Sequence, residues 1–350
     1  MTAKSTFMDE VREQPAVLRR LVDAYETGLA PRLQEAAELV RSNQILVVVG
    51  MGSSHFAGEI LVQRLNQTQL KVINRDASEL YHYQRGMLSD NMVMLAISQS
   101  GESAETCLAA EARPESMPLI CITNDEQSRL AGMGDIVLPL LAGQEEGTSS
   151  KTFVATMALL HLLADAVLDE SVFSAGSASN IADLLEELTE TIAEEVDRFL
   201  PQFGDFHSAA FAGRGPGLVS ALQGALITQE MTQMPAAALS AGQFRHGPIE
   251  AAGPHLLTIV FAPSGRTAHL LVKLARDSAA FGSPTWLVTD PSVQVPSMEN
   301  LFVSQLPKVK EELSPLLSIL VPELLGTGIA ERKGLEPGRL QRISKVTRSE

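Results

Sequence analysis

The chain has 350 residues, which is too long for one ordinary compact domain and suits two. It carries 42 acidic and 27 basic side chains, and this formal net charge of -15 argues against nucleic-acid binding, which needs a basic face. Apolar residues make up 45% of the chain and charged residues 20%, so there is enough apolar material for packed cores and global disorder is excluded.

Cysteine content and hydropathy predict a cytoplasmic protein without a membrane segment. The two cysteines, Cys107 and Cys121, are too few for a disulfide framework, and neither has a cysteine or histidine at metal-ligand spacing. The N-terminal sequence is too polar for a signal peptide. The longest apolar run with a helical pattern, residues 157–168, is about 12 residues long, whereas a membrane span needs about 20.

In chain order, a helical preamble is expected over residues 1–35 and a first domain over residues 36–190. Short, nearly unbroken apolar runs alternate there with helical patterns, which is typical of parallel strands covered by helices on both faces. Five strands are expected, near residues 45–50, 71–74, 93–98, 118–123 and 136–140. The acidic helical stretch Leu184–Asp197, which leads into Pro201, marks the expected domain boundary.

Residues 200–335 repeat the pattern of the first domain, and a basic tail over 336–350 follows as a candidate lid. The Gly-x-Gly turn at Gly50 returns at Gly213, 163 residues later. Five more strands are expected, near residues 208–213, 236–239, 256–262, 285–289 and 301–304. This duplication predicts two tandem α/β domains, each a flavodoxin-like three-layer sandwich with a five-stranded parallel sheet.

Three serine-rich segments precede helices in the first domain, and together they favour a phosphate-ester site. They are Gly52-Ser53-Ser54, the run from Ser98 to Ser103, and Thr148-Ser149-Ser150-Lys151. Parallel sheets bind ligands at the carboxyl ends of their strands, where helix N-termini present unpaired N–H groups. A single such segment is more often a plain helix N-cap, but three at one sheet edge favour a site. The second domain keeps the turns and loses hydroxyls, which indicates one site in a duplicated fold.

A dinucleotide site is the weaker alternative at the same edge. Gly50 and Gly52 begin a Gly-x-Gly turn after a strand, and Asp76 stands near the position of an acidic residue that binds ribose. The third glycine of that fingerprint is missing, because His55 occupies its place.

The second domain contains a separate pair of residues suited to proton transfer. Glu230 lies in an apolar helical pattern from Leu218 to Met234, where a carboxylate could act as the base that removes a proton from carbon. His246 lies on a loop between Arg245 and Gly247, and an imidazole can move a proton to or from a sugar oxygen near neutral pH. Taken alone, each of the two is more often a structural or solvated residue.

The motifs of both halves together resemble the sugar isomerase (SIS) domain family. They are FMDEVREQP at 7–15, GMGSSHFAG at 50–58, SQSGESAET at 98–106, SSKTF at 149–153, GRG at 213–215 and GQFRHGP at 242–248. The whole chain is similar to the isomerase portion of glucosamine-6-phosphate synthase and to its stand-alone relatives.

This resemblance implies a sugar 6-phosphate substrate and chemistry that needs neither a metal nor a cofactor. The family's substrate and phosphate contacts fall on Gly52, Ser53, Ser54, Ser98, Gln99, Ser100 and Ser103, with Gly147 and Ser149 on a loop that closes over the sugar. Its proton-transfer glutamate falls on Glu230. Its ring-opening histidine falls on His246, whose loop can reach the neighbouring subunit of a homodimer. A tail lysine that covers the sugar and can form a Schiff base falls on Lys345.

Two departures from the family pattern bear on the reaction. The synthase has an N-terminal glutaminase domain with a cysteine nucleophile, whereas this chain begins at the preamble. Ile227 replaces a lysine three residues before Glu230, so a positive charge near the sugar is lost. We expect an amino-sugar-phosphate deaminase or an aldose–ketose isomerase that acts on a hexose(amine) 6-phosphate through an enediol or enolamine. A fructosamine-6-phosphate deglycase and a non-enzymatic phosphosugar sensor are the alternatives.

Overall fold

The chain folds into two compact units. The computed structural model describes residues 6–43 and 45–347. The first unit comprises Glu13–Ala182 with the tail Gln341–Glu350, and the second comprises Met1–Arg12 with Asp183–Leu340.

Two long helices contribute residues to both units, so these limits differ from the predicted domain limits. The helices are α1 (Phe7–Glu26) and α7 (Ala175–Phe203). The boundary predicted at the acidic stretch Leu184–Asp197 lies inside α7, and Pro201 lies in the last turn of this helix. The division at Arg12 also splits the predicted preamble. The last three residues of the predicted tail lie outside the described residues.

The first unit is built on a five-stranded parallel sheet. Its strands are β1 (Ile45–Gly50), β2 (Lys71–Asp76), β3 (Val93–Ile97), β4 (Leu119–Thr123) and β5 (Ile136–Pro139). The order across the sheet is β2-β1-β3-β4-β5, which is the flavodoxin-like order. The structure confirms the five predicted strands to within two residues at each end.

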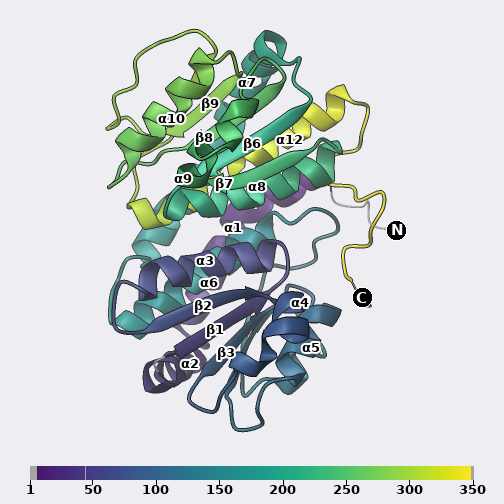
Figure 1. Cartoon of the computed structure of the whole chain (residues 1–350). Coiled ribbons are helices and arrows are strands. Elements are labelled where there is room, and N and C mark those ends of the chain that lie inside the picture. The colour runs from purple at the N-terminus through teal and green to yellow at the C-terminus, as the bar shows by residue number, and fades with distance from the viewer. Residues whose placement is uncertain (1–5, 44, 348–350) are drawn as a thin grey trace. The chain divides into compact units, whose positions relative to one another are not determined.

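Helices cover both faces of this sheet (Figure 1). They are α2 (Ala30–Asn43), α3 (Ser53–Leu65), α4 (Ala77–Glu79), α5 (Ala104–Glu111) and α6 (Lys151–Leu168), with a π-helical turn over Leu80–Gln84 and 3-10 turns over Arg85–Met87 and Ala131–Met133. On one face α3 packs closely on β1, because a Cβ at Gly58 would lie 2.9 Å from Val48 Cγ1. On the other face Cys107 of α5 and Leu80 share a core with Val47 of β1. The first unit is therefore a three-layer sandwich.

The second unit has a sheet of the same size and order. Its strands are β6 (Ser208–Gly213), β7 (Ala236–Ser240), β8 (Leu256–Phe261), β9 (Thr285–Thr289) and β10 (Leu301–Gln305). All pairings are parallel and the order is β10-β9-β8-β6-β7. Counted from β6, this is again the order 2-1-3-4-5 read from the other end, as expected for a duplicated fold.

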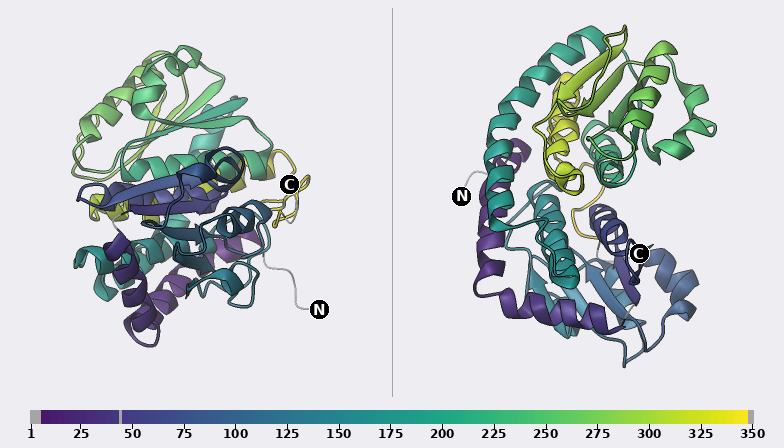
Figure 2. Two further views of the ribbon diagram at one scale, coloured as in Figure 1. Left: turned by 60° about the horizontal axis from the view of Figure 1, so that its bottom comes forward. Right: turned by 90° about the vertical axis from the view of Figure 1, so that its left-hand side faces the viewer.

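Helices also cover both faces of the second sheet (Figure 2). They are α8 (Pro216–Thr232), α9 (Ala241–Arg245), α10 (Ala268–Ala280), α11 (Ser314–Ser318) and α12 (Leu320–Arg332), with 3-10 turns over Pro248–Ala251 and Glu311–Leu313. Gly224 of α8 lies against Phe211 of β6, and Pro322 of α12 packs at the same point. Phe244 of α9 and Leu271 of α10 share a core with other residues of the sheet on its opposite face.

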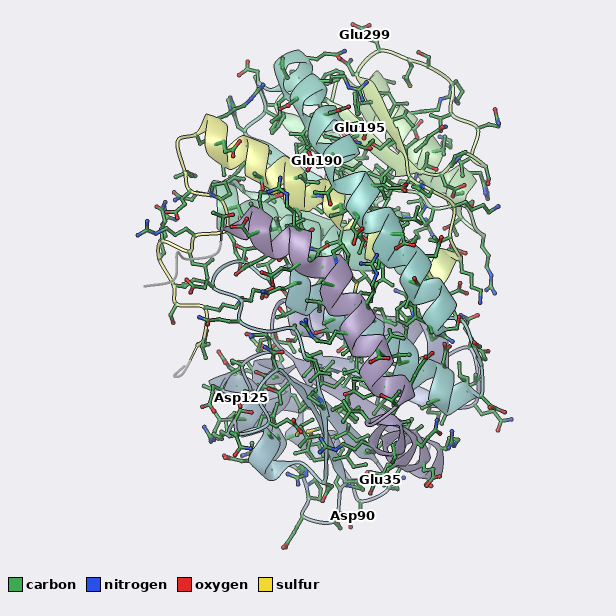
Figure 3. The ribbon with its side chains drawn as sticks, turned by 180° about the vertical axis from the view of Figure 1, so that it is seen from behind. Glu35, Asp90, Asp125, Glu190, Glu195 and Glu299 are labelled. Carbon is green, nitrogen blue, oxygen red and sulfur yellow. The ribbon has the colours of Figure 1, made fainter. Side chains whose placement is uncertain are left out.

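The second half of α7 packs on this sheet through an aromatic cluster and a series of buried hydrogen bonds. Phe199 packs on Trp286 with their ring centroids 4.6 Å apart. Trp286 Nε1 donates to Ser304 Oγ at 2.7 Å, and the Ser304 hydroxyl donates to Glu195, which Figure 3 labels on α7. Burial raises the pKa of Glu195. These contacts stabilise the second half of α7 on the sheet of the second unit.

Two helical stretches are long and apolar enough to cross a membrane by length and composition. They are Lys151–Leu168 and Glu311–Arg332. Each is 89% buried inside the protein, which identifies both as core helices of the fold. The first is longer than the 12-residue apolar run seen in the sequence, because the helix begins at Lys151. The Lys151 ammonium is buried and pairs with Glu13 at 2.5 Å.

His161 is a buried histidine in the middle of α6. Its side chain is buried beside Phe173, with the two ring centroids 5.9 Å apart. Neither ring nitrogen has a hydrogen-bond partner within the described part of the chain. Burial lowers the pKa of His161 to about 3, and the Arg64 guanidinium acts in the same direction. His161 is therefore neutral in the folded protein near pH 7.

Replacing His161 with leucine should make folding less sensitive to acid. Below about pH 6.5 the unfolded histidine binds a proton that the folded one does not, so stability falls as the pH falls toward 3. We expect His161→Leu to be about 1 kcal/mol more stable at pH 7 and to gain up to about 1.4 kcal/mol over the wild type per pH unit below 6.5. Urea unfolding between pH 7 and 4.5 measures this, with the exposed His82→Leu as the control. A His161→Leu advantage that does not grow with acidity contradicts the assignment.

Candidate functional site

The loop after β3 presents two serine hydroxyls in fixed positions. Ser98 Oγ accepts the Gly101 N–H at 3.2 Å, and Ser100 Oγ accepts the Glu102 N–H at 3.1 Å. Because each oxygen already accepts a backbone hydrogen, its own hydrogen points elsewhere and can be donated to an anionic oxygen. The loop ends at α5, whose N-terminus adds backbone N–H groups at the same place.

Gly101 lets this loop sit directly on the end of β4. Its φ of +66° is favourable only for glycine, and a Cβ there would lie 1.9 Å from Ser128 Oγ and 2.9 Å from Thr123 Oγ1. The Gly101 carbonyl accepts the Leu130 N–H at 2.9 Å. The loop geometry is therefore set by packing against the next strand rather than by the loop alone.

Gln99 and Ser103 are held differently from the other two serines. The Gln99 carbonyl accepts the Asn124 N–H at 2.9 Å, which fixes its backbone beside β4 and leaves its side chain half-buried. The Ser103 hydroxyl donates to Glu105 at 3.1 Å within its own helix. A phosphate role for Ser103 therefore requires its hydroxyl to leave Glu105.

The turn after β1 lies at the same sheet edge. Gly52 has φ 49° and ψ −124°, a combination open to glycine, and it occupies the N-cap position of α3. Ser53 and Ser54 are the first two residues of that helix and are half-buried. Strand β1 pairs in parallel with β2 on one side and β3 on the other, so this edge is the point where the strand order reverses. Ligands of open α/β sheets bind at such points.

The C-terminal tail brings Lys345 into the first unit. Lys345 Nζ lies 2.5 Å from Glu145 Oε2 and 2.8 Å from the Gly147 carbonyl oxygen. Two residues later, the Thr347 carbonyl accepts the Ala104 N–H at 3.0 Å, at the first residue of α5 (Figure 1). The tail thus connects the loop that carries Gly147 with the helix that follows the serine loop. Ser149 lies half-buried in the same segment before α6.

Glu145 is the residue of this region that the sequence analysis missed. Its Oε1 accepts the Ser150 and Thr152 N–H groups at 3.0 Å each, and its Oε2 accepts the Thr152 hydroxyl at 2.6 Å. The side chain is fully buried. A glutamate a few residues before a helix start was the available signal, because carboxylates stabilise helix N-termini. Nothing in the sequence paired it with a lysine 200 residues away.

The two predicted proton-transfer residues lie in the second unit. Glu230 is half-buried in the last turn of α8. His246 is exposed directly after α9, next to Gly247, whose φ is +130°. Ile227, at the position where the family pattern has a lysine, is fully buried in the second unit and faces Gly326 of α12.

The second unit fills its own copy of the serine loop with carboxylates. The Ser264 N–H donates to Asp290 at 2.6 Å. The Glu311 carboxyl lies so close to Gly265 that a Cβ there would be 2.0 Å from Glu311 Cδ. Burial raises the pKa of Glu311, against the effect of its bond to the Arg266 N–H. The protein's own acids thus occupy the loop that corresponds to the serine loop of the first unit.

Three other chemistries find little support in the structure. Asp76 accepts the Glu79 N–H at 3.0 Å and so serves as the N-cap of α4, which gives it a structural role in place of ribose binding. Burial raises the pKa of both cysteines, to about 12 for Cys121, which disfavours a thiolate nucleophile. Among the described residues there is no cluster of three or more His, Cys, Asp or Glu that could hold a metal ion.

The sequence is similar to those of known proteins. Residues 38–166 match the SIS domain family. The glutamine–fructose-6-phosphate aminotransferase (isomerizing) of Pyrococcus horikoshii is 28% identical over 348 residues, which cover 97% of this chain and 56% of the relative. The chain therefore spans little more than half the length of the curated relatives it matches.

Solved structures share the fold along nearly the whole chain. The C-terminal domain of glucosamine-fructose-6-phosphate aminotransferase from Francisella tularensis matches with a TM-score of 0.83 at 22% identity, over 96% of this chain and 98% of its own. Glucosamine-6-phosphate deaminase from Thermotoga maritima matches with a TM-score of 0.80 at 19% identity, over 98% and 99%. Residues 38–166 are thus a SIS domain, and the chain is a homologue of the isomerase part of the glutamine–fructose-6-phosphate aminotransferases.

Proposed function

We propose that this protein is an enzyme of two tandem SIS domains that acts on a hexose or hexosamine 6-phosphate. The observation that carries the proposal is the pair of serine hydroxyls at the switch point of the first sheet, which are free to donate because their oxygens already accept loop N–H groups. The turn at Gly52–Ser54 adds a second helix N-terminus to the same edge. Homology to sugar-phosphate enzymes supports the same substrate class.

The proposal gives each predicted residue a role in one proton-transfer reaction. Gly52, Ser53, Ser54, Ser98, Gln99, Ser100 and Ser103 hold the phosphate and sugar, and Gly147 and Ser149 lie on the closing loop. Lys345 covers the substrate. His246 serves ring opening, from the neighbouring subunit of a cytoplasmic homodimer. Glu230 then moves a proton between C1 and C2 through an enediol or enolamine, which requires neither a metal nor a nucleotide.

Deamination of a hexosamine 6-phosphate is the preferred reaction, followed by aldose–ketose isomerisation. In deamination the substrate and water give a ketose 6-phosphate and ammonia. Glucosamine-6-phosphate deaminase of Thermotoga maritima shares the fold over 98% of this chain, which is compatible with that choice. A fructosamine-6-phosphate deglycase is the second candidate, since Ile227 places an apolar side chain where the family pattern has a lysine.

A substrate panel with a Glu230 variant tests the reaction. We expect the wild type to release ammonia and a ketose 6-phosphate from at least one hexosamine 6-phosphate, or to interconvert a hexose 6-phosphate pair. Glu230→Gln should lower kcat at least about 100-fold, because the carboxylate that carries the proton is lost. Gln229→Glu, which places an exposed carboxylate one residue away, is the matched control. Full turnover by Glu230→Gln rejects the mechanism.

The outcomes also separate the alternatives. Turnover of fructose–amino acid 6-phosphates without turnover of hexosamine 6-phosphates selects the deglycase. Tight binding of sugar phosphates without any turnover selects the sensor.

Gly101→Ala should abolish phosphate binding, because it distorts the serine loop without removing any group that would contact the phosphate. A Cβ at Gly101 collides with Ser128 and is strained at positive φ, so we expect a loss of stability of about 2–4 kcal/mol. Ligand-dependent stabilisation should disappear with it. The readout is the shift of Tm with inorganic phosphate and with a hexose 6-phosphate. Gly132→Ala in the same unit is the control, because nothing lies within 4 Å of a Cβ there. An unchanged ligand shift in a folded Gly101→Ala protein argues against this loop as the phosphate site.

A further inference from the structure

We infer that Glu145 is a positioning residue. Its carboxylate holds the Lys345 ammonium and thereby keeps the C-terminal tail bound to the first unit. This inference rests on the proposed function for the role of Lys345, but the contact itself lies within one compact unit. No motif of the sequence analysis included Glu145. The two carboxylate oxygens of Glu145 have different partners.

One oxygen of Glu145 serves the local fold. Oε1 accepts the backbone N–H groups of Ser150 and Thr152 at 3.0 Å each, where α6 begins. These are the unpaired N–H groups that every helix N-terminus presents, and a negative charge is favourable there. This contact holds residues 145–152 in place and does not involve the tail.

The other oxygen is directed to the tail. Oε2 lies 2.5 Å from Lys345 Nζ and 2.6 Å from the Thr152 hydroxyl. The Glu145 side chain is fully buried, and only 16% of the Lys345 side chain is exposed. A charge-assisted hydrogen bond in such a shielded place is much stronger than a surface ion pair, and removal of one partner leaves the other charge buried and unpaired.

Lys345 makes a further contact, so its pairing with Glu145 fixes the position of the ammonium as well as neutralising its charge. Its ammonium also donates to the Gly147 carbonyl at 2.8 Å, which belongs to the predicted closing loop. The Thr347 carbonyl fixes the tail to the first residue of α5. The tail is thus bound beside the serine loop through the Thr347 backbone and on the Glu145 loop through the Lys345 side chain.

Glu145→Gln separates the two functions of the carboxylate. The glutamine carbonyl can replace Oε1 and keep accepting the N–H groups of α6. Its amide group then faces Lys345 and offers hydrogens where Lys345 needs an acceptor. Glu146→Gln is the matched control, because this neighbouring carboxylate is exposed and has no part in the proposed machinery. Lys345→Met is the second variant, since it leaves the start of α6 untouched.

The first measurement needs no substrate. Trypsin can cleave after Arg342 only when the tail opens, so the rate of this cleavage reports how often the tail opens. Mass spectrometry of the undigested protein and its truncated product measures the rate. We expect cleavage to be about tenfold faster in Glu145→Gln and Lys345→Met than in the wild type and Glu146→Gln, as for the loss of one charge-assisted hydrogen bond. If Glu145→Gln does not fold, Lys345→Met carries the test. Equal cleavage rates in a folded Lys345→Met and the wild type overturn the inference.

The second measurement connects the contact to the reaction. With a ketose 6-phosphate and borohydride, reductive trapping on Lys345 should fall about tenfold in Glu145→Gln and stay unchanged in Glu146→Gln. In turnover, kcat should fall more than KM rises, because the phosphate contacts are intact. Unchanged trapping in Glu145→Gln also overturns the inference. Wild-type protein that shows tail protection but neither trapping nor turnover rejects the proposed function and leaves the positioning contact established.

Discussion

The parallel pairing of β1 with β3 is the constraint on which the candidate site depends. It places the carboxyl ends of two strands side by side, so the Gly52–Ser54 turn and the Ser98–Ser103 loop open at one edge. Each turn leads into a helix whose first N–H groups have no partner inside the helix. Short polar side chains and glycines are the residues that let a ligand approach those groups closely. The chemistry of the loops follows from this topology.

The two sheets show how one topology can carry different chemistry. Both have the order 2-1-3-4-5, yet the loop of the second unit accommodates Glu311 and Asp290 where the first has the side chains of Ser98 and Ser100. In the second unit these carboxylates accept the Ser264 and Arg266 N–H groups, whereas in the first unit the Ser98 and Ser100 hydroxyls accept the Gly101 and Glu102 N–H groups. The two loops thus follow the same strand of the same sheet order and differ in the side chains that satisfy their N–H groups.

The sequence predicted the strands, and the position of the serine loop between β3 and α5, because both follow local rules. Unbroken apolar runs between helical patterns identify buried parallel strands, and all ten were found. The continuation of α7 was missed, because the Phe199–Trp286 contact that stabilises it joins residues far apart in sequence. The unsupported burial of His161 and the partner of Lys345 were missed for the same reason. Ser103 matched its motif, but Glu105 takes its hydroxyl, which only coordinates reveal.

The net charge of -15 does not prevent an anion from binding at this edge of the sheet. A phosphate would meet hydroxyls and backbone N–H groups, which attract an anion without adding formal charge to the chain. Lys345 brings the charge that the tail supplies, but Glu145 already compensates it at 2.5 Å. The lysine therefore cannot act as a simple counter-ion that draws phosphate from a distance. Glu145 instead fixes the position of the ammonium, so Lys345 is suited to a contact at short range rather than to long-range attraction of phosphate.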